Sequence, residues 1–341
     1  MTYPPYTITS AILRRVAAIS EQLAAHAAVR GRAEELPSPQ LRRENRIRTI
    51  HASLAIENNT LSLEQVTDII DGKAVIGPPR DIQEVRGAVA AYEKLDVWQP
   101  HRLEDMLSAH EILMRDLVER PGSLRMGGVG VFQGSRVVHM APPAHLVREH
   151  LCRLLDWLKD TEEHPLVSSC VFHYEFEFIH PFADGNGRMG RLWQTLVLSK
   201  WKPLFAYLPV ETIVRNRQAE YYAALGRADE QGEATPFVEF MLSALDDAVA
   251  AIQSDQAGDQ VSDQVRRVLE LLADGEKSAA ELMAALGLRH APTFRKNYLS
   301  PALEAALVER TRPDAPRSPL QKYALTAAGR GVVRNKTSRS T

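Results

Sequence analysis

The chain has 341 residues, 45% of them hydrophobic and 25% charged, a balance typical of a folded protein with a buried core. At roughly 150 residues per domain, this length excludes a single small fold. No apolar run approaches the roughly 18 residues of a membrane helix, and the start lacks the features of a secretory signal, so we expect a cytoplasmic protein with no membrane partner. Two cysteines, Cys152 and Cys170, cannot form a disulfide framework or a zinc site unaided.

Charge is distributed unevenly along the chain. Residues 262–341 contain 14 Lys and Arg against 8 Asp and Glu, whereas the remainder contains 27 against 35. A basic C-terminal unit on an acidic body indicates two modules with different partners.

The body is predicted to be mostly α, because apolar residues recur there at three- and four-residue spacing. Ser38 and Pro39 form a helix start, with an N-cap followed by a proline at the first helical position. Ser62 and Gln65 form a capping box. The expected helices cover about 10–29, 39–58, 62–72, 144–159, 165–179, 187–201, 217–229 and 236–253.

One stretch departs from the helical pattern. Residues 127–140, GGVGVFQGSRVVHM, place valines on both sides of the turn-forming residues 133–135. We expect a β-hairpin, which must rest on helices or serve as a flap because two strands alone are only marginally stable.

The C-terminal part is predicted to be a separate small domain. Residues 254–261 are polar and are the best linker candidate. After them come a helix at about 262–273, a capping box at Ser278 and Glu281, a basic segment, a helix after Ser300, and strands near 307–311 and 321–326. This order resembles a winged helix over 262–330, with a disordered tail at 331–341.

The segment from His180 to Arg191 contains the side chains suited to chemistry. Pro181 ends the preceding helix, so His180 should be its last side chain and should face a loop. Gly185 and Gly187 permit positive φ and leave the N–H groups of the loop open to a ligand.

The helix after this loop is expected to bind an anion. Starting at Gly187, it offers free N–H groups and the positive end of its dipole. Arg188 and Arg191 share one helical face, where two guanidinium groups can hold neighbouring phosphates. Asp184 is placed to bind a hard cation such as Mg²⁺. These residues predict a site for a metal-bound polyphosphate beside an imidazole. Such a site is typical of a transferase that acts on a nucleotide.

The stretch HPFADGNGRMGR at 180–191 resembles the signature of the Fic family, HPFx(D/E)GN(G/K)R followed by a second arginine, without a substitution. The resemblance covers about residues 40–230. It implies a Fic-fold core at 101–253 with the flap at 127–140, behind an N-terminal helical region at 1–100. It also implies transfer of AMP from ATP to a hydroxyl group of a target protein, with Mg²⁺ or Mn²⁺ as the metal.

The resemblance assigns a role to each residue of the loop. His180 would be the general base, since an imidazole titrates near neutrality. Asp184 would hold the metal, and Phe182 would anchor the loop. The nucleotide would be bound by Gly185, Asn186, Gly187 and Arg188, with Arg191 on the γ-phosphate. Asn216 would border the adenine, near Tyr221 and Tyr222.

A second motif concerns regulation. Ser53-Leu54-Ala55-Ile56-Glu57-Asn58 matches the family's inhibitory pattern (S/T)xxxE(G/N), on a helix at about 40–58. Ser53 and Glu57 are four residues apart and share a face. In the family this glutamate pairs with the second arginine, here Arg191, and keeps the γ-phosphate out of its productive position.

Other interpretations stay open beside this one. The same loop would suit a hydrolase that removes AMP, and the body could be an idle Fic domain on a DNA-binding regulator. His173, Glu177 and His180 have helical spacing, but they lack a clear additional ligand for a metal site. Partners implied are a target segment along the flap, the chain itself through self-modification or a homodimer, and DNA or protein at the basic residues Arg289, His290, Arg295 and Lys296.

Overall fold

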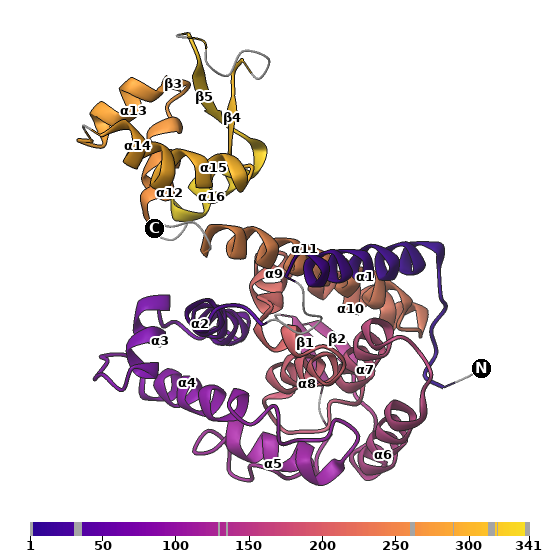
Figure 1. The fold of residues 1–341 in the computed structure, drawn as a ribbon. Coiled ribbons are helices and arrows are strands. Elements are labelled where there is room, and N and C mark those ends of the chain that lie inside the picture. The colour runs from indigo at the N-terminus through magenta and orange to yellow at the C-terminus, as the bar shows by residue number, and fades with distance from the viewer. Residues whose placement is uncertain are drawn as a thin grey trace. The chain divides into compact units, whose positions relative to one another are not determined.

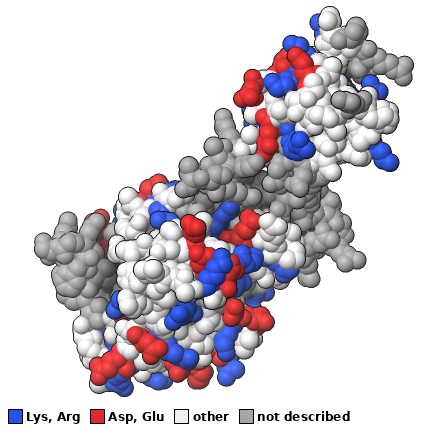
Figure 2. Space-filling view, turned by 90° about the vertical axis from the view of Figure 1, so that its left-hand side faces the viewer, with Lys and Arg blue, Asp and Glu red and all other residues white. Residues whose placement is uncertain are grey.

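The computed structural model describes residues 3–30, 36–128, 130–133, 136–259, 263–288, 290–312, 318 and 320–337. The chain divides into two compact units, residues 1–250 and 251–341. The first contains α1 (Ser10–Arg30), α2 (Pro39–Ile56), α3 (Leu63–Ile70), α4 (Pro79–Tyr92), α5 (Leu103–Leu113), β1 (Gly130–Gln133), β2 (Arg136–Met140), α6 (Ala144–Asp160), α7 (Pro165–Ile179), α8 (Asn186–Trp201), η1 (Pro203–Tyr207), α9 (Val210–Asn216), α10 (Gln218–Gln231) and most of α11 (Thr235–Asp259), as Figure 1 shows. On the face that Figure 2 shows, basic and acidic side chains are interspersed.

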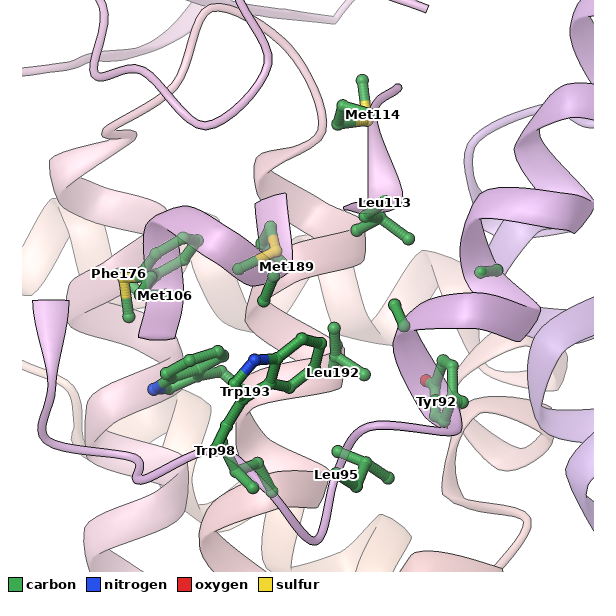
Figure 3. Close-up of a cluster of buried hydrophobic side chains, with 14 of the residues drawn as sticks. Tyr92, Leu95, Trp98, Met106, Leu113, Met114, Phe176, Met189, Leu192 and Trp193 are labelled. Atoms are coloured by element: carbon green, nitrogen blue, oxygen red, sulfur yellow. The ribbon is translucent and has the colours of Figure 1, made fainter. Parts of the chain in front are cut away.

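Helices α7 and α8 form the centre of this unit, and most of their side chains are buried. They approach closely at Gly190, where an added Cβ would lie 2.6 Å from Glu177 Oε1 and 3.0 Å from the ring of His173. Apolar side chains of α4, α5, α7 and α8 form the core beside them (Figure 3). Within it, the rings of Trp98 and Trp193 stack with centroids 6.2 Å apart. The loop between α7 and α8 is therefore held by the best-packed part of the chain.

The helix starts follow the predicted capping chemistry. Ser38 accepts a hydrogen bond from the N–H of Leu41, and Pro39 is the first residue of α2. Ser62 and Gln65 form the complete capping box of α3. Helices α4, α5 and α9 were not predicted, and the residue before each of them makes no side-chain cap.

The hairpin lies where it was predicted, with β1 antiparallel to β2 and a shift of register between Val131 and Phe132. The turn residues 134 and 135 are outside the described residues. Strand β2 contacts α10.

The second unit contains α12 (Asp263–Leu272), β3 (Lys277–Ser278), α13 (Ala279–Ala285), α14 (Ala291–Phe294), η2 (Arg295–Leu299), α15 (Ser300–Glu304), β4 (Val308–Arg310), β5 (Lys322–Leu325) and α16 (Ala327–Thr337). Its antiparallel sheet has the order β3-β5-β4. The predicted capping box at Ser278 and Glu281 is present, and β3, two residues long, was not predicted. The unit has its own hydrophobic core, with Val268, Leu282 and Phe294 among its members.

Two expectations about irregular segments were wrong. The proposed linker at 254–261 is helical through Asp259, as part of α11, and residues 260–262 are outside the described residues. The tail expected to be disordered from 331 is helical to Thr337, because Val333 packs on the core of the second unit; residues 338–341 are not described. In both segments polar composition concealed a helix that continues from an already formed one.

Candidate functional site

The loop from His180 to Asn186 contains two left-handed residues. His180 ends α7 with φ 50° and ψ 60°, and Gly185 precedes α8 with φ 83°. Histidine adopts this region more readily than most side chains, so the chain turns sharply at the imidazole, just before Pro181. A Cβ on Gly185 would lie 2.6 Å from Met114 Sδ, so glycine is needed for space as well as for its φ.

The imidazole of His180 is half-buried, with Nδ1 3.4 Å from the carbonyl oxygen of Glu177. A carbonyl oxygen can only accept, so this contact assigns the proton to Nδ1 and the lone pair to Nε2. This contact favours the tautomer of His180 in which Nε2 carries the lone pair.

Arg125 supports the loop and was missed by the sequence analysis. Its guanidinium, 5% exposed, donates to the carbonyl oxygens of His180 (2.7 Å), Ile179 (3.3 Å), Gly127 (2.8 Å) and Pro142 (2.6 Å). Burial lowers the pKa of Arg125. Gly127 precedes the hairpin and Pro142 follows it, so one side chain ties both ends of the hairpin to the end of α7. A lone arginine outside any motif gave no signal of this role.

Side chains inside the loop hold its backbone. Asn186 Oδ1 accepts from the N–H of Phe182 at 2.9 Å, and Asn186 Nδ2 donates to the carbonyl of the same residue at 3.0 Å. Phe182 is fully buried, as predicted, and its ring stacks on His110 at 3.7 Å. Asn186 was expected to bind nucleotide; since its side chain is used by the loop, its backbone N–H at the start of α8 is the group left to meet an anion.

His110 is a second residue that the sequence analysis missed. Its Nδ1 accepts from the N–H of Gly122 at 2.9 Å, so Nε2 carries the proton and donates to the carbonyl of Asp184 at 3.0 Å. Burial lowers the pKa of His110 to about 4. The ring is therefore neutral at physiological pH and holds the backbone of the loop in one arrangement.

Arg191 is bound by α2. Its Nε donates to Ser53 Oγ at 3.0 Å, and its Nη2 donates to Ser53 O at 2.9 Å and to Glu57 Oε1 at 2.7 Å. Burial alone would lower the pKa of Arg191, but the charge and hydrogen bond of Glu57, together with Tyr221 and Glu177, raise the pKa overall. The structure thus brings Arg191 to Ser53 and Glu57, which precede it by 138 and 134 positions.

Glu57 also lies against the start of α8. A Cβ on Gly187 would collide with Glu57 Oε1 and lie 3.1 Å from Arg191 Nη1. The carboxylate thus occupies the region where the free N–H groups and the dipole of α8 favour an anion. Asn58 follows with φ 68°, a left-handed residue that ends α2 near the predicted position.

Arg188 and Asp184 meet charged residues of α4. Arg188 is 5% exposed, with Nη1 3.2 Å from Glu84 Oε1 and Nη2 3.4 Å from Asp184 Oδ1. Arg80 Nη2 lies 3.0 Å from Asp184 Oδ2. Neither Arg80 nor Glu84 was assigned from the sequence, because about 100 residues separate α4 from the loop and no motif links them.

Asp184 is a suitable donor for the Mg²⁺ or Mn²⁺ that the sequence implies. Its carboxylate is 45% exposed and lies beside a buried guanidinium. Within the described residues, no group of three or more His, Cys, Asp or Glu is arranged to hold a metal. A single carboxylate fits Mg²⁺ bound mainly by substrate phosphates and water. His173, Glu177 and His180, all described, do not form such a group.

His173 belongs to the core. Its Nδ1 lies 2.7 Å from Gln194 Oε1 and its Nε2 accepts from Tyr221 Oη at 3.2 Å. Burial lowers the pKa of His173 to about 3, so the ring is neutral. Tyr221, expected near the adenine, is 2% exposed and packs on this histidine.

The remaining expected adenine residues lie on α9 and α10. Asn216 is exposed at the end of α9. Tyr222 is 45% exposed, and burial together with the charge of Glu57 raises its pKa. Gln218 Nε2 donates to the carbonyl of Ile56 at 3.2 Å, which ties α10 to the end of α2.

None of the described helices has the length and apolar character needed to cross a membrane.

Comparison with known proteins finds two family matches. Residues 100–198 match the Fic/DOC family, and residues 263–326 match the C-terminal domain of the Filamentation induced by cAMP protein Fic-like family. The crystal structure of a Fic family protein from Desulfovibrio desulfuricans G20 is 60% identical, with a TM-score of 0.70 over 96% of this chain and 99% of that chain.

Two nematode proteins are more distant. Protein adenylyltransferase fic-1 of Caenorhabditis briggsae is 34% identical over 218 residues, which cover 59% of this chain and 40% of the relative. The structure of Fic-1 (residues 134–508) of Caenorhabditis elegans is 26% identical, with a TM-score of 0.56 over 70% of this chain and 74% of that chain. The chain thus spans about two fifths of the length of the curated relatives that it matches.

Proposed function

The chain belongs to the Fic family, and on this premise we propose that it is a protein adenylyltransferase, which transfers AMP from ATP to a hydroxyl group of a target protein. The observation that carries the proposal is the loop at 180–191. There an imidazole with a proton on Nδ1 ends α7, and two buried arginines follow on the first turns of α8. A relative at 34% identity is named as a protein adenylyltransferase.

In this mechanism Nε2 of His180 takes the proton of the target hydroxyl as its oxygen attacks the α-phosphorus. The bond from the α-phosphorus to the bridging oxygen breaks, and pyrophosphate leaves with the electron pair. The backbone N–H groups at the start of α8 and the guanidinium groups of Arg188 and Arg191 hold the phosphates. Asp184 would hold Mg²⁺ or Mn²⁺, which would neutralise phosphate charge when bound.

The flap is proposed to align the target. A segment of a partner can add to an open strand edge by main-chain hydrogen bonds, with little dependence on its side chains. Arg125 would set the distance between this edge and His180, because it is bonded to both ends of the hairpin and to the carbonyl of His180.

Glu57 is proposed to inhibit the enzyme. It contacts Arg191 at 2.7 Å and lies against Gly187, where a γ-phosphate would need the same guanidinium and the same helix end. A carboxylate already bound there competes directly with ATP.

Mass spectrometry tests this function. After incubation with ATP and Mg²⁺, the Glu57→Gly variant should gain the mass of AMP on itself or on an added lysate protein, whereas the Glu57→Gly/His180→Ala variant should gain none. Labelling that is equal in the two variants would contradict the role of His180. Labelling that persists in a metal chelator would contradict the role of Asp184.

Removal of AMP is the second candidate, because Glu57 is 32% exposed and its carboxylate could orient a water molecule near the loop. An AMP-modified substrate separates the two functions. A hydrolase would release AMP as wild type and lose this activity in Glu57→Gly, the variant in which a transferase gains activity.

The second unit is proposed as a contact module. The side chains of Arg295 and Lys296 are exposed beside the buried Phe294 and Leu299, while Arg289 lies outside the described residues. Non-specific contact with DNA phosphates requires such basic side chains. A gel shift with the full chain and its Arg295→Ala/Lys296→Ala variant tests DNA binding, and a shift shared by both would contradict this use of the two residues.

A further inference from the structure

The carboxylate of Glu84 on α4 lies beside Arg188 but outside every motif of the sequence. Its Oε1 is 3.2 Å from Arg188 Nη1, and the two residues are 6% and 5% exposed. A guanidinium this deeply buried is very unfavourable without a compensating charge. Glu84 supplies that charge from a helix about 100 residues upstream.

Arg188 nevertheless keeps hydrogen-bonding capacity. Within the described residues, its buried Nε and Nη1 atoms have no hydrogen-bond partner, because the contact with Glu84 has the distance of an ion pair but not the geometry of a hydrogen bond. Buried donors are rarely left unsatisfied in native proteins. A guanidinium that is charged, fixed and incompletely bonded is suited to receive the oxygens of an anion.

Glu84 itself is held rigidly. Its Oε2 accepts from Asn59 Nδ2 at 2.9 Å, and Asn59 also donates to the carbonyl of Asp81 at 3.1 Å. Helix α4 is fixed in turn at Gly87, where an added Cβ would lie 2.5 Å from the carbonyl oxygen of Leu113 on α5. The carboxylate therefore has little freedom to follow the guanidinium if Arg188 moves.

We propose that Glu84 is a positioning residue, which holds the guanidinium of Arg188 in place to bind a phosphate of the nucleotide. The inference rests on the proposed function. A positioning role differs from the inhibitory role of Glu57. Glu57 is bonded to Arg191 and lies against Gly187, so it occupies the groups that an anion would need. Glu84, by contrast, leaves two donors of Arg188 without a bond in the described residues.

A pure charge effect of Glu84 and a positioning role predict opposite changes in nucleotide affinity when Glu84 is removed. Removing a negative charge near an anion site should tighten polyphosphate binding if charge alone matters. If Glu84 positions Arg188, its removal should weaken binding instead. We would measure the Kd of a non-hydrolysable ATP analogue with Mg²⁺ by calorimetry, for Glu57→Gly and for Glu57→Gly/Glu84→Gln, and expect about tenfold weaker binding in the second.

Glu175 on α7 offers a matched control. It is 5% exposed, and burial raises its pKa to about 7, so Glu175→Gln also replaces a buried acid by an amide. This control should leave the Kd unchanged. Tighter or unchanged binding in the Glu84→Gln variant would overturn the proposal, and so would an equal loss in the control.

A second measurement covers the case of a general loss of structure. In an Arg188→Ala background the carboxylate of Glu84 has lost its contact with Arg188 but keeps a 3.4 Å contact with Arg80 Nε, so adding Glu84→Gln should not lower the Tm and should cause no further loss of affinity. A further tenfold loss there would overturn the positioning role. If Glu57→Gly itself binds no nucleotide, the proposed function fails, and this role of Glu84 fails with it.

Discussion

Arg188 and Arg191 lie one turn apart on α8 and are almost equally buried, yet the chain treats them differently. Arg191 is bound by Ser53 and Glu57 of α2, through three hydrogen bonds. Arg188 faces Glu84 of α4 and keeps donors without a bond in the described residues. The difference indicates that burial alone does not determine whether an arginine can bind phosphate. The geometry of its carboxylate partner determines how many of its donors are already used.

The largest expected effect is on the affinity for the ATP analogue, and it distinguishes Arg191 from Arg188. Arg191→Ala should weaken binding of the ATP analogue by about 10- to 100-fold relative to Glu57→Gly, since charge-assisted hydrogen bonds contribute about 1.5–3 kcal/mol each. Adding Glu57→Gly to Arg191→Ala should restore little affinity, because the carboxylate has already lost its partner.

In an Arg188→Ala background, by contrast, Glu57→Gly should still improve binding. Calorimetry on the wild type, Glu57→Gly, Arg191→Ala and Glu57→Gly/Arg191→Ala forms one double-mutant cycle, and the same set with Arg188→Ala forms a second. Equal gains from Glu57→Gly in both arginine backgrounds would show that Glu57 does not act through Arg191.

The second prediction concerns the stability of the loop that carries both arginines. The folded-state pKa of His110, about 4, lies below the unfolded value of about 6.5, so the unfolded chain binds the extra proton between these values. This contribution is present above pH 6.5 and is lost as the pH falls toward 4, by about 3 kcal/mol.

Denaturant unfolding between pH 4 and 7 measures this slope. His110→Gln replaces the imidazole with an amide that can hydrogen-bond but does not titrate. The variant should be less stable than wild type at pH 7 and should lose stability less steeply on acidification. The buried His173 titrates in an overlapping window and remains in both proteins. Parallel pH slopes for the two proteins would contradict the assignment to His110.

The third prediction concerns a variant that removes one hydrogen bond between α2 and Arg191 but keeps Glu57. Ser53→Ala deletes the acceptor of the Nε bond but leaves the backbone and Glu57 bonds, so we expect a gain in AMP incorporation of only about two- to fivefold. Ser20→Ala is the control, because it removes a serine hydroxyl that donates to the carbonyl of Val16 within α1 and not one that contacts Arg191. A loss of labelling in Ser53→Ala would show that Ser53 supports activity.

The smallest expected effect concerns Arg80. Its side chain is 57% exposed and its Nε lies 3.4 Å from Glu84 Oε1, while its contact with Asp184 is an ordinary surface ion pair worth about 0–1 kcal/mol. Removing it by Arg80→Ala should raise Mn²⁺ affinity in the presence of the ATP analogue by about two- to threefold, as measured by electron paramagnetic resonance. Lys73→Ala, which removes a surface pair with Asp68, should leave that affinity unchanged.

The sequence by itself determined much of the local structure. Capping residues such as Ser38 and Ser62 and the proline after His180 act on their own neighbours, so helix starts, the loop and its glycines could be predicted from short-range chemistry. The family motif added the pairing of Glu57 with Arg191. Polar composition misled at 254–259 and 331–337, where a helix continues from a formed one.

The tertiary structure alone decided which distant side chains complete the site. Arg125, His110 and Glu84 lie on separate elements, and each acts on the loop through a contact that depends on how the helices pack. No periodicity or spacing records such a contact, because the partners are 55 to 104 residues apart and their side chains are ordinary surface types until packing buries them.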